Sequence, residues 1–180
     1  MQHLYFIRHG QSQANADHII AGSHESPLSD VGKQQSEYAG DTAKRFFSFD
    51  LIVSSPMKRA KQTADIIAEK IGYPLEKIII MPDLRERNLG DVEGKDYSHA
   101  PHHNGNYEDA ENIPGVEPVD KLLTRMQGVL EDLQFRPEQN ILVVAHNGCG
   151  RMLRAVVQGK QPMAMYEQAR LDNAVFYTFI

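Results

Sequence analysis

Short apolar runs alternate with longer amphipathic segments along the chain. Residues 4–7, 50–54, 77–81 and 141–145 form runs that are too brief for helices, and such runs are typical of buried strands. The C-terminal residues 174–180 are rich in β-branched and aromatic side chains, so we expect a last strand there.

Between these runs, apolar residues recur at intervals of three and four, which is the spacing of one helix face. Ser29 is a suitable N-cap for a helix that runs to about residue 47, although Gly32 and Gly40 weaken this prediction. We expect the helix to bury an inward stripe that consists of Val31, Tyr38, Ala39, Thr42, Phe46 and Phe47.

Three more helices are predicted further along the chain. One begins near Pro56 and runs to about residue 71, where Gly72 and Pro74 form a stop signal. Another covers about residues 119–133, and the last follows Gly148 to about residue 158.

Strands that alternate with helices predict the α/β class, because parallel neighbouring strands need a crossover and the crossover is usually a helix. We therefore expect a three-layer sandwich with a mainly parallel central sheet flanked by helices. Ligands in such folds bind where the strands end, at their carboxyl ends.

The length of 180 residues fits one domain over residues 1–180, with a core large enough to need no disulfide or metal. Residues 96–118 are polar, lack a clear period and contain Pro101, Pro114 and Pro118. We interpret this segment as an irregular insertion that roofs the functional site.

Composition narrows the possible partners. The hydrophobic content of 41% is ordinary, and no apolar run is long enough to span a membrane. The N-terminus does not resemble a secretory signal and Cys149 is the single cysteine, so a cytoplasmic location is expected. A net charge of -5 argues against nonspecific nucleic-acid binding, and any anionic ligand must therefore be held locally.

Two of the predicted strands end in a histidine that is close to a glycine, namely His9 and His146. Parallel strands would bring both histidines to the same crevice. Arg8 precedes the first histidine, and Arg59 follows another predicted strand. Two guanidinium groups with nearby helix N-termini suit a phosphate dianion, because arginine binds phosphate oxygens in a bidentate manner.

Several motifs resemble the histidine phosphatase superfamily, which is also described as phosphoglycerate mutase-like. The resemblance spans nearly the whole chain, and its combination of motifs in this order is specific. The motifs are Arg8-His9-Gly10, Gln11-Ser12 with Asn15, Pro27-Leu28-Ser29 to Gly32, the block 54–64, Leu84-Arg85-Glu86, Gly90-Asp91-Val92-Glu93-Gly94, and Val144 to Gly148.

The resemblance implies that His9 is the nucleophile and that Glu86 is the proton donor. It also implies that Arg8, Arg59 and His146 bind the phosphoryl group. A neutral imidazole attacks phosphorus if a carbonyl holds its other ring N–H. Glu86 would need a raised pKa, and His146, if protonated, would help to balance phosphate charge.

Further polar residues are expected to bind the substrate: Gln11, Asn15 and Asn147. The same roles make a metal or other cofactor unnecessary, since the arginines do the work that metal ions do in other phosphoryl-transfer enzymes.

Other interpretations of these residues stay open at this point. Glu93 lies in the same region as Glu86 and is the alternative proton donor. The two strand-end histidines are possible metal ligands, but arginine and glycine flank them in place of carboxylates or thiolates. His99, His102 and His103 are expected in an exposed loop, and Ser12 and Ser55 have no expected base partner that would make them nucleophiles.

We expect a metal-independent phosphomonoesterase that acts on a small phosphorylated metabolite, as a monomer or homodimer. Phosphoglycerate mutases are longer and have extra segments that retain the phosphoryl group, which favours hydrolysis here. A mutase and a non-catalytic phosphate-binding protein are the alternatives.

Overall fold

The computed structural model describes residues 1–100, 112–159 and 170–180. A five-stranded sheet lies at its centre, in the order β3-β2-β4-β1-β5. The first four strands in this order are parallel, and β5 runs antiparallel to β1. The strands are β1 (His3–Arg8), β2 (Leu51–Ser54), β3 (Ile79–Ile80), β4 (Asn140–Ala145) and β5 (Phe176–Thr178).

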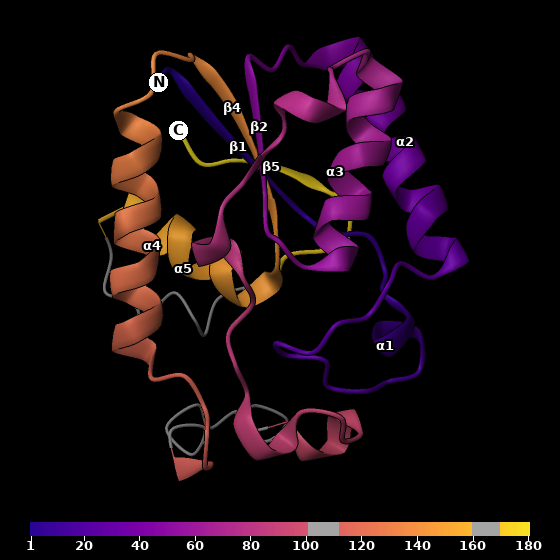
Figure 1. Cartoon of the computed structure of the whole chain (residues 1–180), viewed down its shortest axis with the longest axis vertical. Helices are drawn as coiled ribbons and strands as arrows, with labels where there is room; N and C mark the ends of the chain where they lie inside the picture. The colour runs from indigo at the N-terminus through magenta and orange to yellow at the C-terminus, as the bar shows by residue number, and fades with distance from the viewer. Residues whose placement is uncertain (101–111, 160–169) are drawn as a thin grey trace.

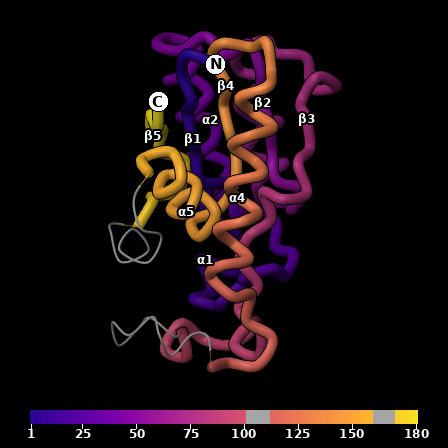
Figure 2. Tube along the Cα trace, turned by 90° about the vertical axis from the view of Figure 1, so that its left-hand side faces the viewer, coloured from indigo at the N-terminus to yellow at the C-terminus, as the bar shows by residue number. Residues whose placement is uncertain are grey.

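Helices cover both faces of the sheet, with α2 (Asp30–Phe46) and α3 (Lys58–Ile71) on one face and α4 (Val119–Gln134) and α5 (Asn147–Val157) on the other (Figure 1). Figure 2, turned by 90°, places α4 in front of the sheet and α2 behind it. The α/β sandwich with a mainly parallel sheet is thus confirmed.

The alternation of side chains along β1 divides the core into two layers. Leu4 and Phe6 belong to the cluster that packs against α4 and α5. Ile7 belongs to the opposite cluster, which packs against α2 and α3. Successive residues of a strand point to opposite faces, so a strand buried on both sides is apolar throughout.

Several short elements, which were not predicted, connect the large ones. Helix α1 (Gln13–Ala16) is capped by Ser12, whose hydroxyl accepts a hydrogen bond from the Asn15 amide. Four 3-10 turns also occur among the described residues: η1 (Leu75–Lys77), η2 (Pro82–Leu84), η3 (Gly90–Val92) and η4 (Tyr97–His99).

The inward stripe predicted for α2 is only partly confirmed, since Ala39 is buried and Phe47 packs partly buried against the core. Val31, Tyr38 and Phe46 are 51%, 76% and 75% exposed. The buried face consists of small residues instead, namely Gly32, Ser36, Ala39, Gly40 and Ala43. Small side chains allow α2 to approach α3 closely at Gly40, whereas Gly32 packs against the backbone of Gln11.

The third strand is shorter than predicted, since β3 covers only Ile79–Ile80 of the expected residues 77–81. The η1 turn occupies Lys77, and Pro82 begins η2 directly after Met81. Proline supplies no N–H for pairing, so it limits the length of this edge strand.

No helix in the described parts of the chain combines the length and apolarity that crossing a membrane requires.

Candidate functional site

The two predicted site histidines lie side by side because their strands are neighbours. Strands β1 and β4 pair in parallel, with Arg8 opposite Ala145, so the next residues, His9 and His146, leave the sheet together. Their ring centroids are 5.1 Å apart and the rings are inclined by 61°. Both side chains are buried.

The backbone around His9 is fixed from several sides. Its own carbonyl accepts a hydrogen bond of 2.7 Å from the Asn173 amide, and the Gly10 N–H donates to the Thr63 hydroxyl over 3.0 Å. Gly10 also packs against the Gly32 carbonyl, where an added Cβ would lie only 2.3 Å from the oxygen. The Arg8-His9-Gly10 turn therefore needs glycine at its third position.

One ring nitrogen of His9 donates a hydrogen bond to a carbonyl, and the other accepts a hydrogen bond. Nδ1 lies 2.6 Å from the Gly10 carbonyl oxygen, and Nε2 lies 3.2 Å from Nε of Arg59, which donates to it. Burial, together with the charges of Arg59 and Arg8, lowers the pKa of His9 well below its ordinary value. His9 is thus a neutral imidazole with its proton on Nδ1 and its lone pair on Nε2.

Arg59 comes from the first turn of α3 and is almost fully buried. Its two terminal nitrogens donate to the carbonyl oxygens of His24 and Gly22, each over 2.8 Å. These bonds aim the guanidinium Nε at His9.

Arg8 ends β1 and is also buried. Its Nη1 donates to the Leu171 carbonyl over 2.9 Å, while its Nε has no partner among the described residues. Burial and the nearby charge of Arg170 lower the pKa of Arg8 to about 10, which keeps the side chain charged at neutral pH. Neither Arg8 nor Arg59 forms a direct ion pair with a described carboxylate, although the charge of Glu86 acts on both. An anion between them would therefore meet two cations whose charge is only partly balanced.

His146 is the N-cap residue of α5, and its Nε2 lies 2.7 Å from the Ser55 hydroxyl oxygen. Its Nδ1 is buried and has no partner in the described parts of the chain. Burial and the charge of Arg59 lower the pKa of His146 well below its ordinary value. The condition under which His146 would balance phosphate charge, namely protonation, is therefore not met in the free protein: this imidazole is neutral and offers a hydrogen bond.

Glu86 rests on the N-terminus of α5. Its Oε2 accepts a hydrogen bond from the Gly148 N–H over 3.1 Å, and its Oε1 accepts from the amides of Cys149 at 3.3 Å and Arg87 at 2.9 Å. Amides in the first turn of a helix favour a carboxylate. The carboxyl is thereby held beside His146, which precedes the same turn.

Glu93, the alternative proton donor, binds groups of two neighbouring loops. It accepts hydrogen bonds from the Ser23 N–H at 2.7 Å, the Ser23 hydroxyl at 2.9 Å and the Leu89 N–H at 2.8 Å. Its side chain is buried and also lies 3.3 Å from His24 Nε2. These contacts give Glu93 a structural task, the tethering of the loop around residue 23 to the loop around residue 90.

The three predicted substrate-binding side chains are engaged with other parts of the chain. Gln11 Oε1 accepts from the Ser29 hydroxyl at 2.8 Å. The Asn15 amide donates to the Tyr97 hydroxyl at 2.8 Å, and Asn147 Oδ1 accepts from the Leu171 N–H at 3.0 Å. Asn15 therefore links α1 to the segment predicted as a roof, and Asn147 holds the returning C-terminal segment.

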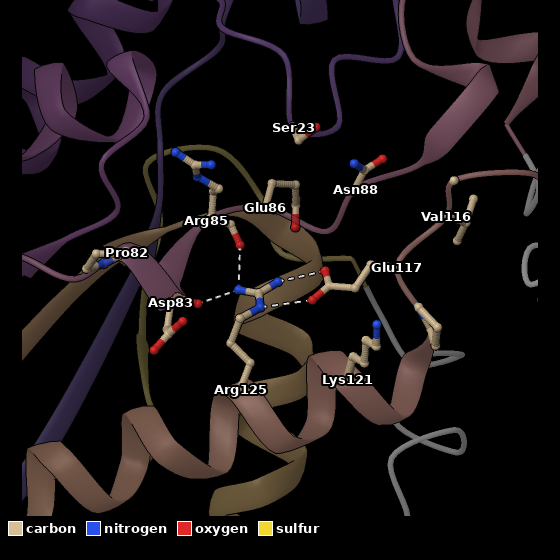
Figure 3. Close-up of a pocket in the computed structure, with 12 residues that line it drawn as sticks. Ser23, Pro82, Asp83, Arg85, Glu86, Asn88, Val116, Glu117, Lys121 and Arg125 are labelled. Carbon is tan, nitrogen blue, oxygen red and sulfur yellow. Dashed lines mark hydrogen bonds and ion pairs between the residues drawn. The ribbon is translucent and has the colours of Figure 1, made fainter.

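A cavity of about 630 Å³ opens beside Glu86 (Figure 3). Arg125 on α4 fixes one wall, because it binds both carboxylate oxygens of Glu117, at 3.0 and 2.8 Å, and donates to the carbonyls of Asp83 and Arg85. The full lining comprises Ser23, Pro82, Asp83, Arg85, Glu86, Asn88, Gly115, Val116, Glu117, Pro118, Lys121 and Arg125.

Of the three histidines in the predicted loop, the structure describes only His99. His99 is exposed, and its Nδ1 lies 3.4 Å from the Ser98 hydroxyl. His102 and His103 lie outside the described residues. Within the described residues, no three His, Cys, Asp or Glu side chains gather as metal ligands.

Sequence reasoning missed three residues that shape the site. Asn173 and Thr63 hold the turn around His9, and Ser55, for which no histidine partner was expected, touches His146. The position of Ser55 directly after a predicted strand could have indicated that it lies near the strand-end histidines. Asn173 carried no local signal, since its contact depends on the chain returning beside β1.

Comparisons with known proteins agree with this geometry. The model of the histidine phosphatase superfamily (branch 1) matches residues 4–179. The uncharacterized phosphatase PhoE of Bacillus subtilis (strain 168) is 35% identical over 176 residues, which cover 97% of this chain and 86% of PhoE. Phosphoglycerate mutase-like protein 4 of Arabidopsis thaliana is 32% identical, with 96% of this chain and 76% of that protein covered.

A solved structure shows the same fold. The alpha-ribazole phosphatase from Shigella flexneri superposes with a TM-score of 0.81 at 29% identity, covering 98% of this chain and 89% of the other. A family match over nearly the whole length, with Arg8, His9, Arg59, Glu86 and His146 gathered at the ends of neighbouring elements, leads to one conclusion: this chain belongs to the histidine phosphatase superfamily.

Proposed function

We propose that this protein is a metal-independent phosphomonoesterase that acts on small phosphorylated metabolites through a phosphohistidine on His9. One observation carries the proposal: the Gly10 carbonyl holds Nδ1 of His9 at 2.6 Å, which places the nucleophilic lone pair on Nε2, where it now accepts a hydrogen bond from Arg59. Relatives that are named phosphatases support the assignment to hydrolysis.

In the first step, Nε2 of His9 attacks phosphorus and the ester P–O bond breaks. In the substrate complex, the negative charge of the bound phosphate favours the protonated form of Glu86. Glu86 then delivers this proton to the departing alcohol oxygen, and the phosphoryl group remains on Nε2. Arg8 and Arg59 donate hydrogen bonds to the equatorial oxygens, where charge accumulates in the transition state. Arg59 exchanges its present bond to Nε2 for one to phosphate, which uncovers the lone pair.

In the second step, water attacks the phosphorus of the phosphohistidine and the P–N bond breaks. The Glu86 carboxylate accepts a proton from this water, and inorganic phosphate leaves while His9 returns to its neutral form. The same carboxyl thus serves as an acid and then as a base.

The alcohol part of the substrate would lie in the cavity beside Glu86, since the proton donor forms part of its wall. Gln11, Asn15 and Asn147 would contact the phosphate or its surroundings after exchanging their present hydrogen bonds. Tyr97 joins Asn15 and comes from the segment that we propose as the roof.

The test is hydrolysis of p-nitrophenyl phosphate in excess chelator, with wild type, His9→Ala and His3→Ala compared. His3 is an exposed histidine at the start of β1, the strand that precedes His9, so its variant controls for the loss of an imidazole. We expect turnover by the wild type and by His3→Ala, and a loss of about 10³-fold or more in His9→Ala.

Rapid acid quenching would trap an acid-labile phosphoryl group on the wild type and none on His9→Ala. An inactive wild type, or full activity of His9→Ala, contradicts the proposal.

A relative of comparable similarity is named phosphoglycerate mutase-like, so isomerisation requires its own measurement. Conversion of 3-phosphoglycerate to 2-phosphoglycerate, with and without a bisphosphate primer, is expected to be absent. Isomerisation faster than release of inorganic phosphate would replace the phosphatase with a mutase.

A further inference from the structure

A buried contact joins Ser55 to His146. The two residues follow the neighbouring strands β2 and β4, which pair with Ser54 opposite Val144. The Ser55 N–H donates to the Val144 carbonyl over 3.0 Å, and the hydroxyl oxygen lies 2.7 Å from Nε2 of His146. Because both side chains are fully buried, water does not compete for this bond.

The direction of this bond follows from the remaining bonds of Ser55. Its hydroxyl oxygen already accepts a hydrogen bond from the Met57 N–H over 3.3 Å. The hydroxyl hydrogen needs an acceptor as well, because an unpaired buried donor is costly. Among the described residues, the acceptor within reach is Nε2 of His146. Ser55 therefore donates, and His146 accepts.

The direction of the bond determines which nitrogen of His146 carries the proton. A neutral imidazole has one N–H, and Nε2 uses its lone pair for Ser55, so the proton is on Nδ1. Nδ1 is the buried atom without a partner in the described chain. The neighbours that influence His146 most strongly are Arg59, His9 and Arg8, the groups assigned to the phosphoryl site.

We propose that Ser55 is a positioning residue that fixes His146 as the Nδ1–H tautomer, so that a neutral N–H donor meets the phosphoryl oxygen. With the opposite tautomer, Nδ1 would present a lone pair to a negatively charged oxygen and repel it. The inference rests on the proposed function only for the identity of the ligand that accepts this hydrogen bond.

The tautomer is measured directly by NMR with ¹⁵N-labelled histidine, since protonated and bare ring nitrogens have well separated shifts. A His146→Asn sample identifies the signals of this ring among the eight histidines. In the wild type we expect the proton on Nδ1. Ser55→Thr, which retains a hydroxyl, is expected to keep that tautomer, and Ser55→Ala is expected to lose the preference.

Binding of inorganic phosphate, measured by calorimetry, is the second readout. We expect Ser55→Ala to weaken phosphate binding by about tenfold, with Ser55→Thr restoring most of it. Ser54→Ala is the matched control, because Ser54 is a neighbouring buried serine whose hydroxyl donates to the Ser55 carbonyl and, among the described residues, forms no hydrogen bond to His9 or His146. Its phosphate affinity should equal that of the wild type.

Two results would overturn the role of Ser55. One is a proton on Nε2 of His146 in the wild type. The other is an equal loss of phosphate affinity in Ser55→Ala and Ser54→Ala, which would indicate a general packing effect. Thermal melting of each variant confirms that folded protein is compared, and Ser55→Thr keeps the test valid if the alanine variant unfolds.

The outcome is separable from that of the proposed function. The NMR and calorimetric measurements need no turnover, so a wild type that binds phosphate through an Nδ1–H tautomer but hydrolyses nothing would contradict the phosphatase and support the role of Ser55.

Discussion

His9 shows how a single side chain acquires its chemistry from neighbours that are far away in the sequence. The Gly10 carbonyl sets its tautomer, Arg59 faces its lone pair, and Asn173 holds its backbone. The resemblance implied the role of His9 through a combination of motifs that includes Arg8-His9-Gly10. These contacts were not predicted, because they depend on which elements become neighbours in space.

The proton donor is tested by comparing two leaving groups. We expect Glu86→Gln to lower kcat on an alkyl phosphate by about 10²-fold or more, since the alkoxide cannot leave unprotonated. The loss should be much smaller on p-nitrophenyl phosphate, because p-nitrophenolate leaves without a proton. Equal losses on both substrates would remove Glu86 from this role.

Glu93→Gln is the companion variant. Because Glu93 bonds the loops around Ser23 and Leu89, we expect a lower melting temperature and little dependence of the remaining activity on the leaving group. A strong dependence on the leaving group would make Glu93 the proton donor.

The buried neutral histidines predict how stability depends on pH. Burial lowers the pKa values of His9 and His146 below about 6.5, the ordinary value that both have in the unfolded chain. As the pH falls through that value, the unfolded state takes up protons that the folded state does not, so the free energy of unfolding falls.

Urea denaturation from about pH 7 to about pH 5 measures this slope. We expect a shallower slope for His146→Asn than for the wild type, whereas His3→Asn, at an exposed position, should leave it unchanged. Identical slopes in all three proteins would show that His146 contributes nothing.

At the scale of elements, the close approach of α2 and α3 depends on small residues. An added Cβ at Gly40 would lie 2.7 Å from Cβ and Cγ of Lys70 on α3. The periodicity of the sequence correctly predicted a helix here but assigned several exposed residues to the buried face, because hydrophobicity patterns favour large side chains and this contact uses glycine and alanine.

Gly40→Ala should therefore lower stability by about 1–3 kcal/mol, although alanine favours helices. Gly128, in the interior of α4, has no atom near the place of its missing Cβ, and Gly128→Ala should raise stability by about 0.5–1 kcal/mol. Chemical denaturation of both variants checks the opposite signs. Stabilisation by Gly40→Ala would contradict the tight contact.

At the scale of the whole molecule, Arg125 ties α4 to the chain before Glu86 and to Glu117 before α4 itself. The bonds to Glu117 raise the pKa of Arg125 even though burial opposes this, so Arg125 stays charged. The sequence placed Arg125 on a helix but did not indicate these partners, since Asp83 and Arg85 approach it only after the helix packs on the sheet.

We expect Arg125→Met to lower the free energy of unfolding by about 1–3 kcal/mol, because it leaves the half-buried Glu117 carboxylate without its cation. Lys33→Met breaks the exposed pair with Asp30 and should change stability by less than about 0.5 kcal/mol. Denaturant unfolding of both variants tests the difference. Equal effects would mean that the Arg125 hydrogen bonds stabilise the folded protein no more than an exposed ion pair does.

The C-terminal segment illustrates the limit of sequence reasoning at this scale. The last strand was predicted, but not that residues 171–174 would pass beside the two histidines. Leu171 accepts a bond from Arg8, and Ala174 donates to the Arg8 carbonyl over 2.9 Å. These contacts follow from β5 joining the sheet beside β1, and no local pattern specifies that neighbour.

The two histidines and the cavity beside Glu86 depend on different kinds of structure. The spacing of the two imidazoles is set by a ladder of main-chain bonds, which depends little on side-chain identity, whereas side chains from turns and from α4 line the cavity beside Glu86. In the proposed function, changes in that lining would exchange one alcohol for another, while the ladder keeps the two imidazoles at the same spacing.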